Sequence, residues 1–177
     1  ISGLTKATRN PQKPLIIILG GTKIKDKINI VNNLNSKTKF FLFGSSVLNE
    51  IKKPEVKNIL KNKKCILPKD FIEKNGSFFD IGGETISEYR KILLTAKTII
   101  WNGPVGMAEN KKYSKGTFGV AMAVINSKAF KVVGGGETAN FILKNKMGKK
   151  IDLLSTGGGA MLDFLAGKKM PGIEALK

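Results

Sequence analysis

Two glycine-rich stretches, each followed by a charged side chain, are the parts of this sequence best suited to chemistry. The first, GGTK, places Lys23 directly after a glycine pair, and Lys27 follows soon after it. The second, GGGETA, places Glu137 directly after three glycines in a row. Glycine-loop amides and lysine side chains bind phosphates, and a carboxylate can supply oxygen to Mg²⁺. The other candidate ligand contacts in these stretches are Gly20, Gly21, Gly134, Gly135, Gly136 and Thr138.

Two further loops carry residues of the same kinds. One is an Asn-Gly-Pro turn, and the carboxylate of Glu109 that follows it could accept a hydrogen bond from a ribose hydroxyl. The other is a second glycine triplet near the end of the chain. A tight turn needs one or two glycines, so two triplets favour an anion-binding role over turn formation alone. The candidate residues of these loops are Asn102, Gly103, Pro104, Gly157, Gly158 and Gly159.

The composition removes several kinds of chemistry. The 177 residues contain no histidine, which excludes Ser-His-Asp and Cys-His nucleophiles, histidine bases and histidine metal ligands. Cys65 is the only cysteine, so no intrachain disulfide can form, which fits a reducing cytoplasm. The chemistry that remains uses lysines, carboxylates, backbone amides and a metal held by oxygen.

The charge balance bears on the class of partner. The formal net charge is +18, from 31 basic and 13 acidic residues. Nearly all the basic residues are lysines spread along the chain, and they do not interleave with aromatic residues as a base-stacking groove would require. We therefore expect a solvated lysine-rich surface rather than a nucleic-acid partner. No apolar run approaches the ~20 residues that span a bilayer, so no membrane partner is expected.

Short apolar runs recur along the chain, bounded by Gly, Pro or Asn, and stretches of helical period such as 85–96 and 114–125 lie between most of them. Strands alternating with helices indicate a parallel sheet, and continuous apolar strands indicate a sheet covered on both faces. We predict a doubly wound α/β domain, a Rossmann-like three-layer sandwich with a mostly parallel six-stranded sheet. The predicted strands are 15–19, 39–43, 65–67, 98–101, 131–133 and 152–154, and the polar stretch 68–80 is predicted to be mostly loop.

The glycine loops each follow a predicted strand. In an open parallel sheet all strands end at one edge, where ligands bind, and each following helix directs free N–H groups there. The chain has no P-loop motif, and its loose dinucleotide fingerprint at 134–139 lacks the acidic residue expected about 20 positions on. A NAD-type dinucleotide-binding oxidoreductase domain is therefore the alternative. Phosphoryl transfer, which needs positioning and electrostatic stabilisation more than a protein nucleophile, suits these residues better.

Five segments, taken in order, resemble a known family. They are NPQKPLIIILGGTKIKDKI, DIGGETISEYRKILLTAKTIIWNGPVGMAE, YSKGTF, FKVVGGGETA and STGGGAMLDFLAGKKMPGIEAL. In this order they resemble the C-terminal, nucleotide-binding domain of the phosphoglycerate kinase family. The resemblance implies reversible phosphoryl transfer between 1,3-bisphosphoglycerate and ADP, with Mg²⁺, in glycolysis and gluconeogenesis. It also implies two domains that close over a cleft by a hinge.

The resemblance implies a role for each candidate residue. Lys23 is implied to follow the transferring phosphoryl group, Lys27 to contact the nucleotide phosphates, and Glu109 to bind the ribose. Asn102 and Pro104 are implied to lie in the nucleotide loop. The residues implied to meet the phosphates and the metal are Gly135, Gly136, Glu137 and Thr138, and those implied to supply a helix N-terminus that stabilises transferred charge are Gly157, Gly158 and Gly159.

Three features depart from the family pattern. Glu137 stands where aspartate is usual, and Gly83 stands where proline is usual. The segment FGSSVLNE, after the second predicted strand, is shorter than the glycine-rich segment that lies beside the adenine in many members. The first and third departures bear on how the metal is held and on nucleotide preference.

The resemblance also implies a division of the chain. Residues 1–14 are expected to be the end of an interdomain helix and a linker, 15–170 the nucleotide-binding domain, and 171–177 a C-terminal tail. A domain preceding residue 1 would hold 3-phosphoglycerate or 1,3-bisphosphoglycerate. We therefore expect the chain alone to bind ADP or ATP with little or no activity, as a cytoplasmic monomer.

Overall fold

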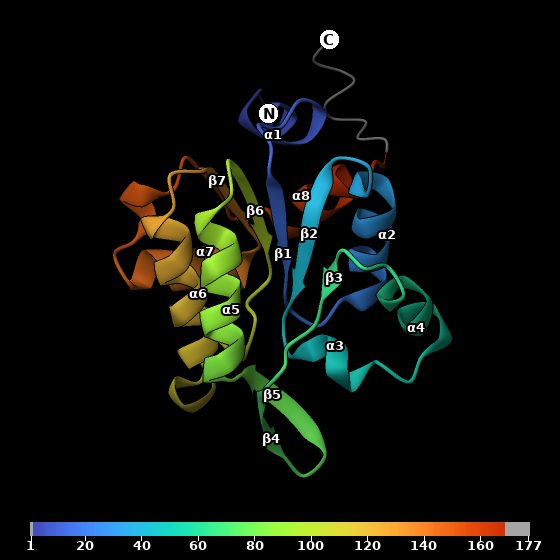
Figure 1. The fold of residues 1–177 in the computed structure, drawn as a ribbon. Coiled ribbons are helices and arrows are strands. Elements are labelled where there is room, and N and C mark those ends of the chain that lie inside the picture. Colours follow the sequence, from blue (N-terminus) through green and yellow to red (C-terminus); the bar gives the residue numbers. More distant parts are fainter. Residues whose placement is uncertain (1, 169–177) are drawn as a thin grey trace.

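The computed structural model describes residues 2–168, and the expected tail 171–177 lies outside this range. The chain forms a three-layer α/β sandwich in which helices cover both faces of one sheet (Figure 1). Among the described residues, no helix combines the length and apolar character needed to cross a bilayer. The sheet strands are β1 (Leu15–Leu19), β2 (Thr38–Phe43), β3 (Cys65–Ile66), β6 (Thr98–Asn102), β7 (Phe130–Gly134) and β8 (Leu153–Ser155).

The six strands follow the order β3-β2-β1-β6-β7-β8, and every neighbouring pair is parallel. The predicted doubly wound sheet is thus confirmed, and each predicted strand lies within about two residues of an observed one. This order has a single point, between β1 and β6, where the chain direction across the sheet reverses. Open α/β sheets bind ligands at this switch point.

The strand β1 shows why the sheet is buried on both faces. All five residues of its sequence LIIIL are buried. Ile16 and Ile18 face one side of the sheet, and Leu15, Ile17 and Leu19 face the other, because side chains alternate along a strand. An apolar residue at every position is therefore needed to fill two cores.

Each core is closed by its own set of helices. The first core packs against α5 (Gly83–Leu94), α6 (Lys115–Asn126) and α7 (Gly136–Lys144), and it includes the fully buried Trp101. The second packs against helices on the opposite face: α1 (Ser2–Arg9), α2 (Ile24–Leu34), α3 (Ser46–Asn49), α4 (Pro54–Leu60) and α8 (Gly158–Leu165). Two 3₁₀ turns, η1 (Lys111–Tyr113) and η2 (Gly148–Lys150), complete the elements.

The helix α1, which lies in the expected interdomain segment 1–14, packs onto the second core through Ala7. The ammonium group of Lys37 donates hydrogen bonds to the carbonyl oxygens of Thr8 (3.0 Å) and Arg9 (3.1 Å). A lysine that caps the last carbonyls of a helix satisfies acceptors that would otherwise lack partners. The helix is therefore fixed to this domain at its C-terminal end.

The prediction that residues 68–80 are mostly loop is wrong. They contain β4 (Phe71–Lys74), which pairs antiparallel with β5 (Ser77–Ile81). Asn75 and Gly76 both have positive φ, as a two-residue hairpin turn requires. Every residue of β4 is exposed. Because neither face of the strand is buried, nothing requires apolar and polar residues to alternate, and its sequence FIEK lacks the alternation by which a strand is predicted. The turn and the pairing with β5, rather than burial, form this strand.

Candidate functional site

The switch point of the sheet is formed by two loops that cross. Gly20 N–H donates to the carbonyl of Asn102 (2.9 Å), and Gly21 N–H donates to the carbonyl of Pro104 (2.8 Å). A Cβ at Gly20 would lie 2.0 Å from the Pro104 oxygen, so only glycine fits there. At position 103 only glycine fits, for two reasons: its φ is +83°, and a Cβ would lie 2.1 Å from the Gly20 carbonyl oxygen. The crossing fixes the loops after β1 and β6 to one another.

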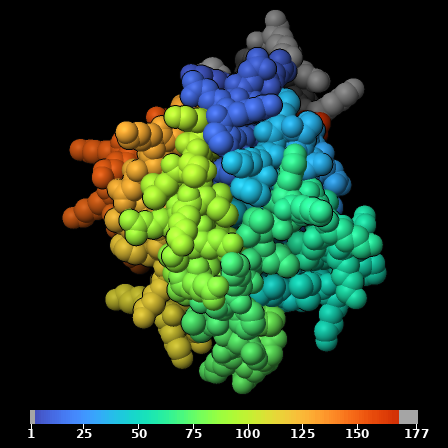
Figure 2. Space-filling model, in the orientation of Figure 1, coloured from blue at the N-terminus to red at the C-terminus, as the bar shows by residue number. Residues whose placement is uncertain are grey.

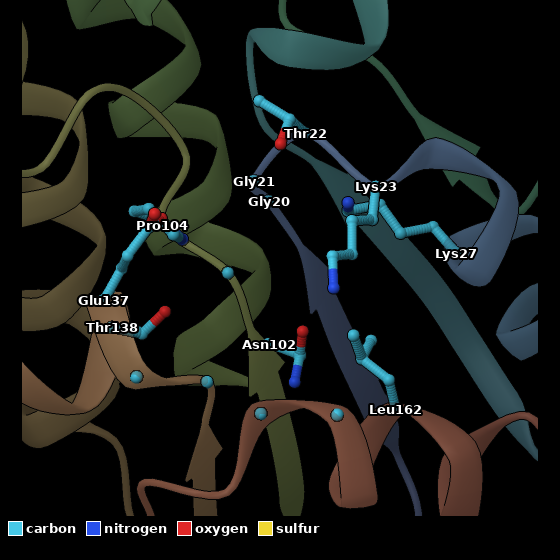
Figure 3. A pocket seen from close by; sticks show the side chains of 15 residues that line it. Gly20, Gly21, Thr22, Lys23, Lys27, Asn102, Pro104, Glu137, Thr138 and Leu162 are labelled. Atoms are coloured by element: carbon cyan, nitrogen blue, oxygen red, sulfur yellow. The ribbon is translucent and has the colours of Figure 1, made fainter.

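Beside this crossing lies a pocket of about 280 Å³ (Figure 3). Loops from four strands form its walls, and all four come from the edge of the sheet at which the strands end. It brings together most of the residues expected from the sequence. Those that line it are Gly20, Gly21, Lys23, Lys27, Asn102, Gly103, Pro104, Gly135, Gly136, Glu137, Thr138, Gly158 and Gly159, together with Thr22 and Leu162.

Three helices begin at the pocket wall, namely α2, α7 and α8. Each N-terminus presents unpaired backbone N–H groups and a partial positive charge. Gly135, which precedes α7, has a φ of +97°, a conformation that favours glycine. A Cβ at Gly158, the first residue of α8, would lie only 3.2 Å from the Gly135 Cα. The glycines therefore let the N-termini of α7 and α8 approach closely, where both can act on one anion.

Two lysines add positive charge to the pocket. The Lys27 side chain is only 3% exposed, and burial lowers the pKa of its ammonium group to about 8, against the opposing attraction of Asp26. No salt bridge within residues 2–168 involves Lys27. Lys23 is exposed, and in Figure 3 its side chain points toward Asn102 and Leu162. A buried lysine without a salt bridge is costly, so this pocket is suited to an anion that would pair with Lys27.

Two polar atoms in the pocket residues are buried and have no hydrogen-bond partner among residues 2–168: Nδ2 of Asn102 and Oγ1 of Thr138. Asn102 is 5% exposed and Thr138 is fully buried. Nearly all buried polar groups in folded proteins have a partner, and an exception calls for a missing ligand or water. An amide donor and a hydroxyl fit the oxygen atoms of a phosphate.

A second compartment of about 340 Å³ adjoins the first and shares Gly21, Thr22, Pro104 and Glu137 with it. It contains Glu109, which does not line the first pocket. Its further walls come from α3 and its flank, from the hairpin, and from the loop after β6. These residues are Ser45, Ser46, Asn49, Ser77, Phe78, Phe79, Gly106 and Met107.

The hairpin is held against α3 by one side chain. Asn49 Nδ2 donates to the Phe78 carbonyl (3.1 Å), and Asn49 Oδ1 accepts from the Phe78 N–H (2.9 Å). These two bonds pair the backbone N–H and carbonyl of Phe78, the groups that a neighbouring strand would pair with in a wider sheet. The Ser46 hydroxyl also donates to the Gly21 carbonyl (2.7 Å), which joins α3 to the first glycine loop. The second compartment therefore has fixed walls on both sides.

Two of the expected glycines lie outside the pocket lining. Gly134 is buried at the end of β7, where a Cβ would lie 1.8 Å from the Met161 sulfur, so its role is to admit α8. Gly157 precedes α8 and is exposed. Thr22 and Ser45 were missed from the sequence, although both follow the ends of strands and the same edge rule would have found them. Phe78 and Asn49 could not be found in that way, because the hairpin was not predicted.

The side chains of this site are compatible with a Mg²⁺ ion that is held partly by the protein and partly by a bound ligand. Among residues 2–168 no cluster of three or more His, Cys, Asp or Glu side chains could hold a metal ion. Glu137 is exposed in the first turn of α7, and in Figure 3 its side chain reaches toward Pro104, where the two compartments meet. Mg²⁺ is commonly held by one or two carboxylates, water and substrate phosphates, so a single carboxylate here is sufficient.

Comparison with known proteins identifies the family of this chain. The family profile described as phosphoglycerate kinase matches residues 1–64 and 53–168. The phosphoglycerate kinase of Clostridium tetani is 38% identical over 98% of this chain and 53% of its own length, and that of Finegoldia magna is 36% identical over 97% and 53%. This chain thus spans about half the length of these relatives.

Solved structures lead to the same family. The phosphoglycerate kinase of Coxiella burnetii superposes with a TM-score of 0.88 at 31% identity, over 99% of this chain and 56% of the other. That of Pyrococcus horikoshii gives 0.87 at 29% identity, over 99% and 54%. From its sequence matches and its fold, the chain belongs to the phosphoglycerate kinase family.

Proposed function

We propose that this chain is the nucleotide-binding half of a phosphoglycerate kinase and that its pocket binds the phosphates of ADP or ATP. The observation that carries the proposal is the convergence in one pocket of three helix N-termini and the buried, unpaired Lys27. Each of these features favours negative charge. Because they surround a volume of about 280 Å³, a polyphosphate chain would contact all of them.

The proposed roles follow from position. Lys27 pairs with nucleotide phosphates, and Lys23, which is exposed, follows the phosphoryl group as it is transferred. Asn102 and Thr138 supply hydrogen bonds to phosphate oxygens. The nucleoside occupies the second compartment, where Glu109 accepts from a ribose hydroxyl. Gly158 and Gly159 present the N-terminus of α8 to the charge that develops during transfer.

Mg²⁺ would be held by Glu137 together with the nucleotide phosphates. When bound, the ion neutralises charge on the phosphates. The position of Glu137 between the two compartments suits this role, because the phosphates that follow the nucleoside must pass it. The longer side chain, compared with the usual aspartate, is compatible with contact through water.

The full reaction is phosphoryl transfer between 1,3-bisphosphoglycerate and ADP in the cytoplasm, as in glycolysis and gluconeogenesis. The curated relatives are about twice as long as the stretch they share with this chain. The glycerate would therefore be held mainly by residues outside the 177 described by this sequence. We propose that the chain alone binds nucleotide as a monomer and transfers little or no phosphate.

Calorimetric titration with ADP and Mg²⁺ tests the site. Lys27→Met should weaken ADP binding by on the order of tenfold or more, because it removes a desolvated charge from the phosphates. Lys25→Met is the matched control, since Lys25 lies exposed on the same helix and outside the pocket lining. Equal affinity of wild type and Lys27→Met for ADP would refute the assignment.

The pH dependence gives a second readout. Burial lowers the pKa of Lys27 to about 8, and only the protonated form attracts phosphate. The ADP affinity of the wild type should therefore be steady between about pH 7, where the terminal phosphate is ionised, and pH 8, and should fall above pH 8, whereas Lys27→Met should show no such fall. A titration with NAD distinguishes the oxidoreductase alternative, which the family assignment does not favour: NAD binding tighter than ADP would support that alternative.

A further inference from the structure

The edge of the sheet at which the strands begin is opposite the glycine pocket, and it carries a concentration of lysines. Figure 1 shows α1 at this amino edge, and α3 and the hairpin at the other. A lysine lies within three residues before the first residue of every strand of the six-stranded sheet. In chain order these lysines are Lys13, Lys37, Lys64, Lys97, Lys128 and Lys150.

Acidic residues are nearly absent from the same segments. The segments that lead into the six strands are 6–13, 36–39, 62–64, 95–98, 127–131 and 148–152, and Asp152 is their only acidic residue. Asp152 lies 3.6 Å from the ammonium group of Lys131, so its charge is already shared. These segments, which all lie within residues 2–168, therefore carry a large excess of positive charge.

Two hollows open on this edge, and three lysines line each of them. The first, of about 350 Å³, is lined by Lys6, Lys128 and Lys131, and also by Asp152, so three positive charges face one negative charge. The second, of about 280 Å³, is lined by the lysines Lys13, Lys37 and Lys39. We call these residues, with Lys64, Lys97 and Lys150, the basic edge. Like charges around a concave surface raise the local potential, so these hollows attract anions more strongly than isolated surface lysines do.

We propose that the basic edge binds the phosphate backbone of a double-stranded nucleic acid without sequence specificity. Lysine is a point charge suited to phosphate contacts, and the near absence of arginine argues against bidentate reading of bases. The aromatic rings on this edge, Phe40 and Phe130, are partly buried beneath Lys39 and Lys6, at 5.7 and 5.4 Å from their ammonium groups. They are therefore not free to stack on the bases of a single strand.

A membrane surface fits this edge less well. Lasting attachment to a bilayer requires apolar side chains that enter it as well as positive charge. The exposed large apolar side chains within residues 2–168 are Phe71, Ile72, Leu94, Phe118, Met122 and Leu143. They lie on the hairpin and on α5, α6 and α7, and none belongs to the segments that lead into the strands.

The size of the edge fits a short length of duplex. Six strands with a spacing of about 4.8 Å span about 24 Å, which corresponds to roughly seven base pairs of B-form DNA. If each strand contributes one phosphate contact, the logarithm of the affinity should fall with the logarithm of salt concentration with a slope of about −5. Binding should thus be appreciable at low salt and weak at physiological salt.

The sequence alone favours a solvated lysine surface over a nucleic-acid partner, because the lysines are spread evenly along it. The topology changes this expectation. In a parallel sheet every strand begins at the same edge, so the lysines that precede the strands are brought together there. The basic edge is distinct from the proposed nucleotide pocket, which is formed where the strands end. The two sites can therefore be tested separately.

Fluorescence anisotropy with a labelled duplex of about 20 base pairs tests the proposal. The edge variant is Lys13→Gln, Lys39→Gln and Lys128→Gln combined, and all three side chains are exposed. The control variant combines Lys52→Gln, Lys74→Gln and Lys115→Gln, which are also exposed but lie toward the other edge, near α3, on the hairpin and at the start of α6. The two variants have the same net charge.

The edge variant should lose on the order of tenfold or more in duplex affinity, and its salt slope should be shallower by about 3, whereas the control should match the wild type. The corresponding Lys→Arg edge variant should bind as the wild type does. Saturating ADP with Mg²⁺ should leave duplex binding unchanged. This expectation does not depend on where ADP binds, so the proposal for the basic edge can be tested independently of the proposed nucleotide pocket.

Several results would overturn the proposal. Equal losses of duplex affinity in the edge and control variants would show that binding depends on the net charge of the protein and not on the basic edge. Displacement of the duplex by ADP would place the duplex in the glycine pocket instead. Binding to phosphatidylserine vesicles without binding to the duplex at about 50 mM salt would identify a membrane surface as the partner, and absence of both would leave the basic edge a solvated surface.

Discussion

Asp80, near the end of β5, makes a sharp prediction about how stability depends on pH. Its side chain is fully buried, Oδ2 accepts from the Gly116 N–H (2.8 Å), and Oδ1 accepts from the Ile81 N–H (2.9 Å). A Cβ at Gly106 or Gly116 would lie 2.0 or 2.3 Å from Oδ1, so both glycines make room for this carboxylate. No salt bridge within the described chain involves it. The carboxylate joins the hairpin to the start of α6.

Burial raises the pKa of Asp80 from 3.8 to about 6, although the hydrogen bonds from Gly116 and Ile81 oppose the change. The folded protein thus holds this proton more tightly than the unfolded chain does. The contribution of the Asp80 carboxyl to the free energy of unfolding is therefore greatest below pH 4 and is lost as the pH rises through 6. A difference of about two pKa units corresponds to about 3 kcal/mol. Asp80→Asn cannot titrate, so this decline should disappear.

Urea unfolding at pH 4 to 7.5, followed by the fluorescence of the buried Trp101, measures the effect. Between pH 4 and 6.5 the wild type should lose about 2 kcal/mol relative to Asp80→Asn, because part of the total is already lost at pH 4. Asp70→Asn is the control. Burial raises the pKa of Asp70, but hydrogen bonds from the side chain and backbone of Thr85 and the backbone of Glu84 outweigh burial and lower it. Its titration therefore lies below pH 4, and the variant should keep the wild-type slope.

If the stability of Asp80→Asn follows that of the wild type across this range, Asp80 does not titrate there and the reasoning from burial is refuted. A uniform offset between the two curves has a different meaning. The amide retains one acceptor oxygen and loses the other, which costs about 1 kcal/mol at every pH. Only the slope reports the buried charge.

Three other substitutions test packing at and near the site. Gly20→Ala should unfold the protein or destabilise it by about 4 kcal/mol or more in urea, because its Cβ would lie 2.0 Å from the Pro104 carbonyl oxygen. Gly136→Ala, whose Cβ would meet only the Thr156 oxygen at 3.8 Å, should keep or raise stability by up to about 1 kcal/mol while weakening ADP binding in calorimetry. Tyr89→Phe leaves two carbonyl acceptors, at 2.7 and 3.1 Å, without their donor and should cost about 1 to 3 kcal/mol in urea.

The sheet could be predicted from the sequence because burial on both faces forces an apolar residue at every position. The runs LIIIL and TIIWN, each followed by Gly and too short for a typical helix, form β1 and β6, and every residue of both is buried. The hairpin could not be predicted by the same rule, because no residue of β4 is buried in the core. Its one local signal is Asn75-Gly76, and a turn signal alone does not show whether strands flank the turn.

The candidate site was predictable to the extent that parallel strands end at one edge. That rule alone brings the loops after β1, β6, β7 and β8 together. It cannot say which lysine is buried, because burial of Lys27 depends on how α2 packs against its neighbours. Nor can it separate Glu109, which lines the second compartment alone, from Glu137, which lines both. Those distinctions require the tertiary packing.

The glycines of this edge fall into two groups that look alike in the sequence. At Gly20, Gly103 and Gly134 the missing Cβ is replaced by protein atoms, namely a crossing backbone or the Met161 sulfur, at 1.8 to 2.1 Å. At Gly136 and Gly159 the space that a Cβ would enter is open toward the pocket. The first group is needed for the fold to close at its switch point, and the second leaves room for a ligand. A glycine triplet such as 134–136 therefore combines both requirements, which is why three glycines stand where a turn would need one.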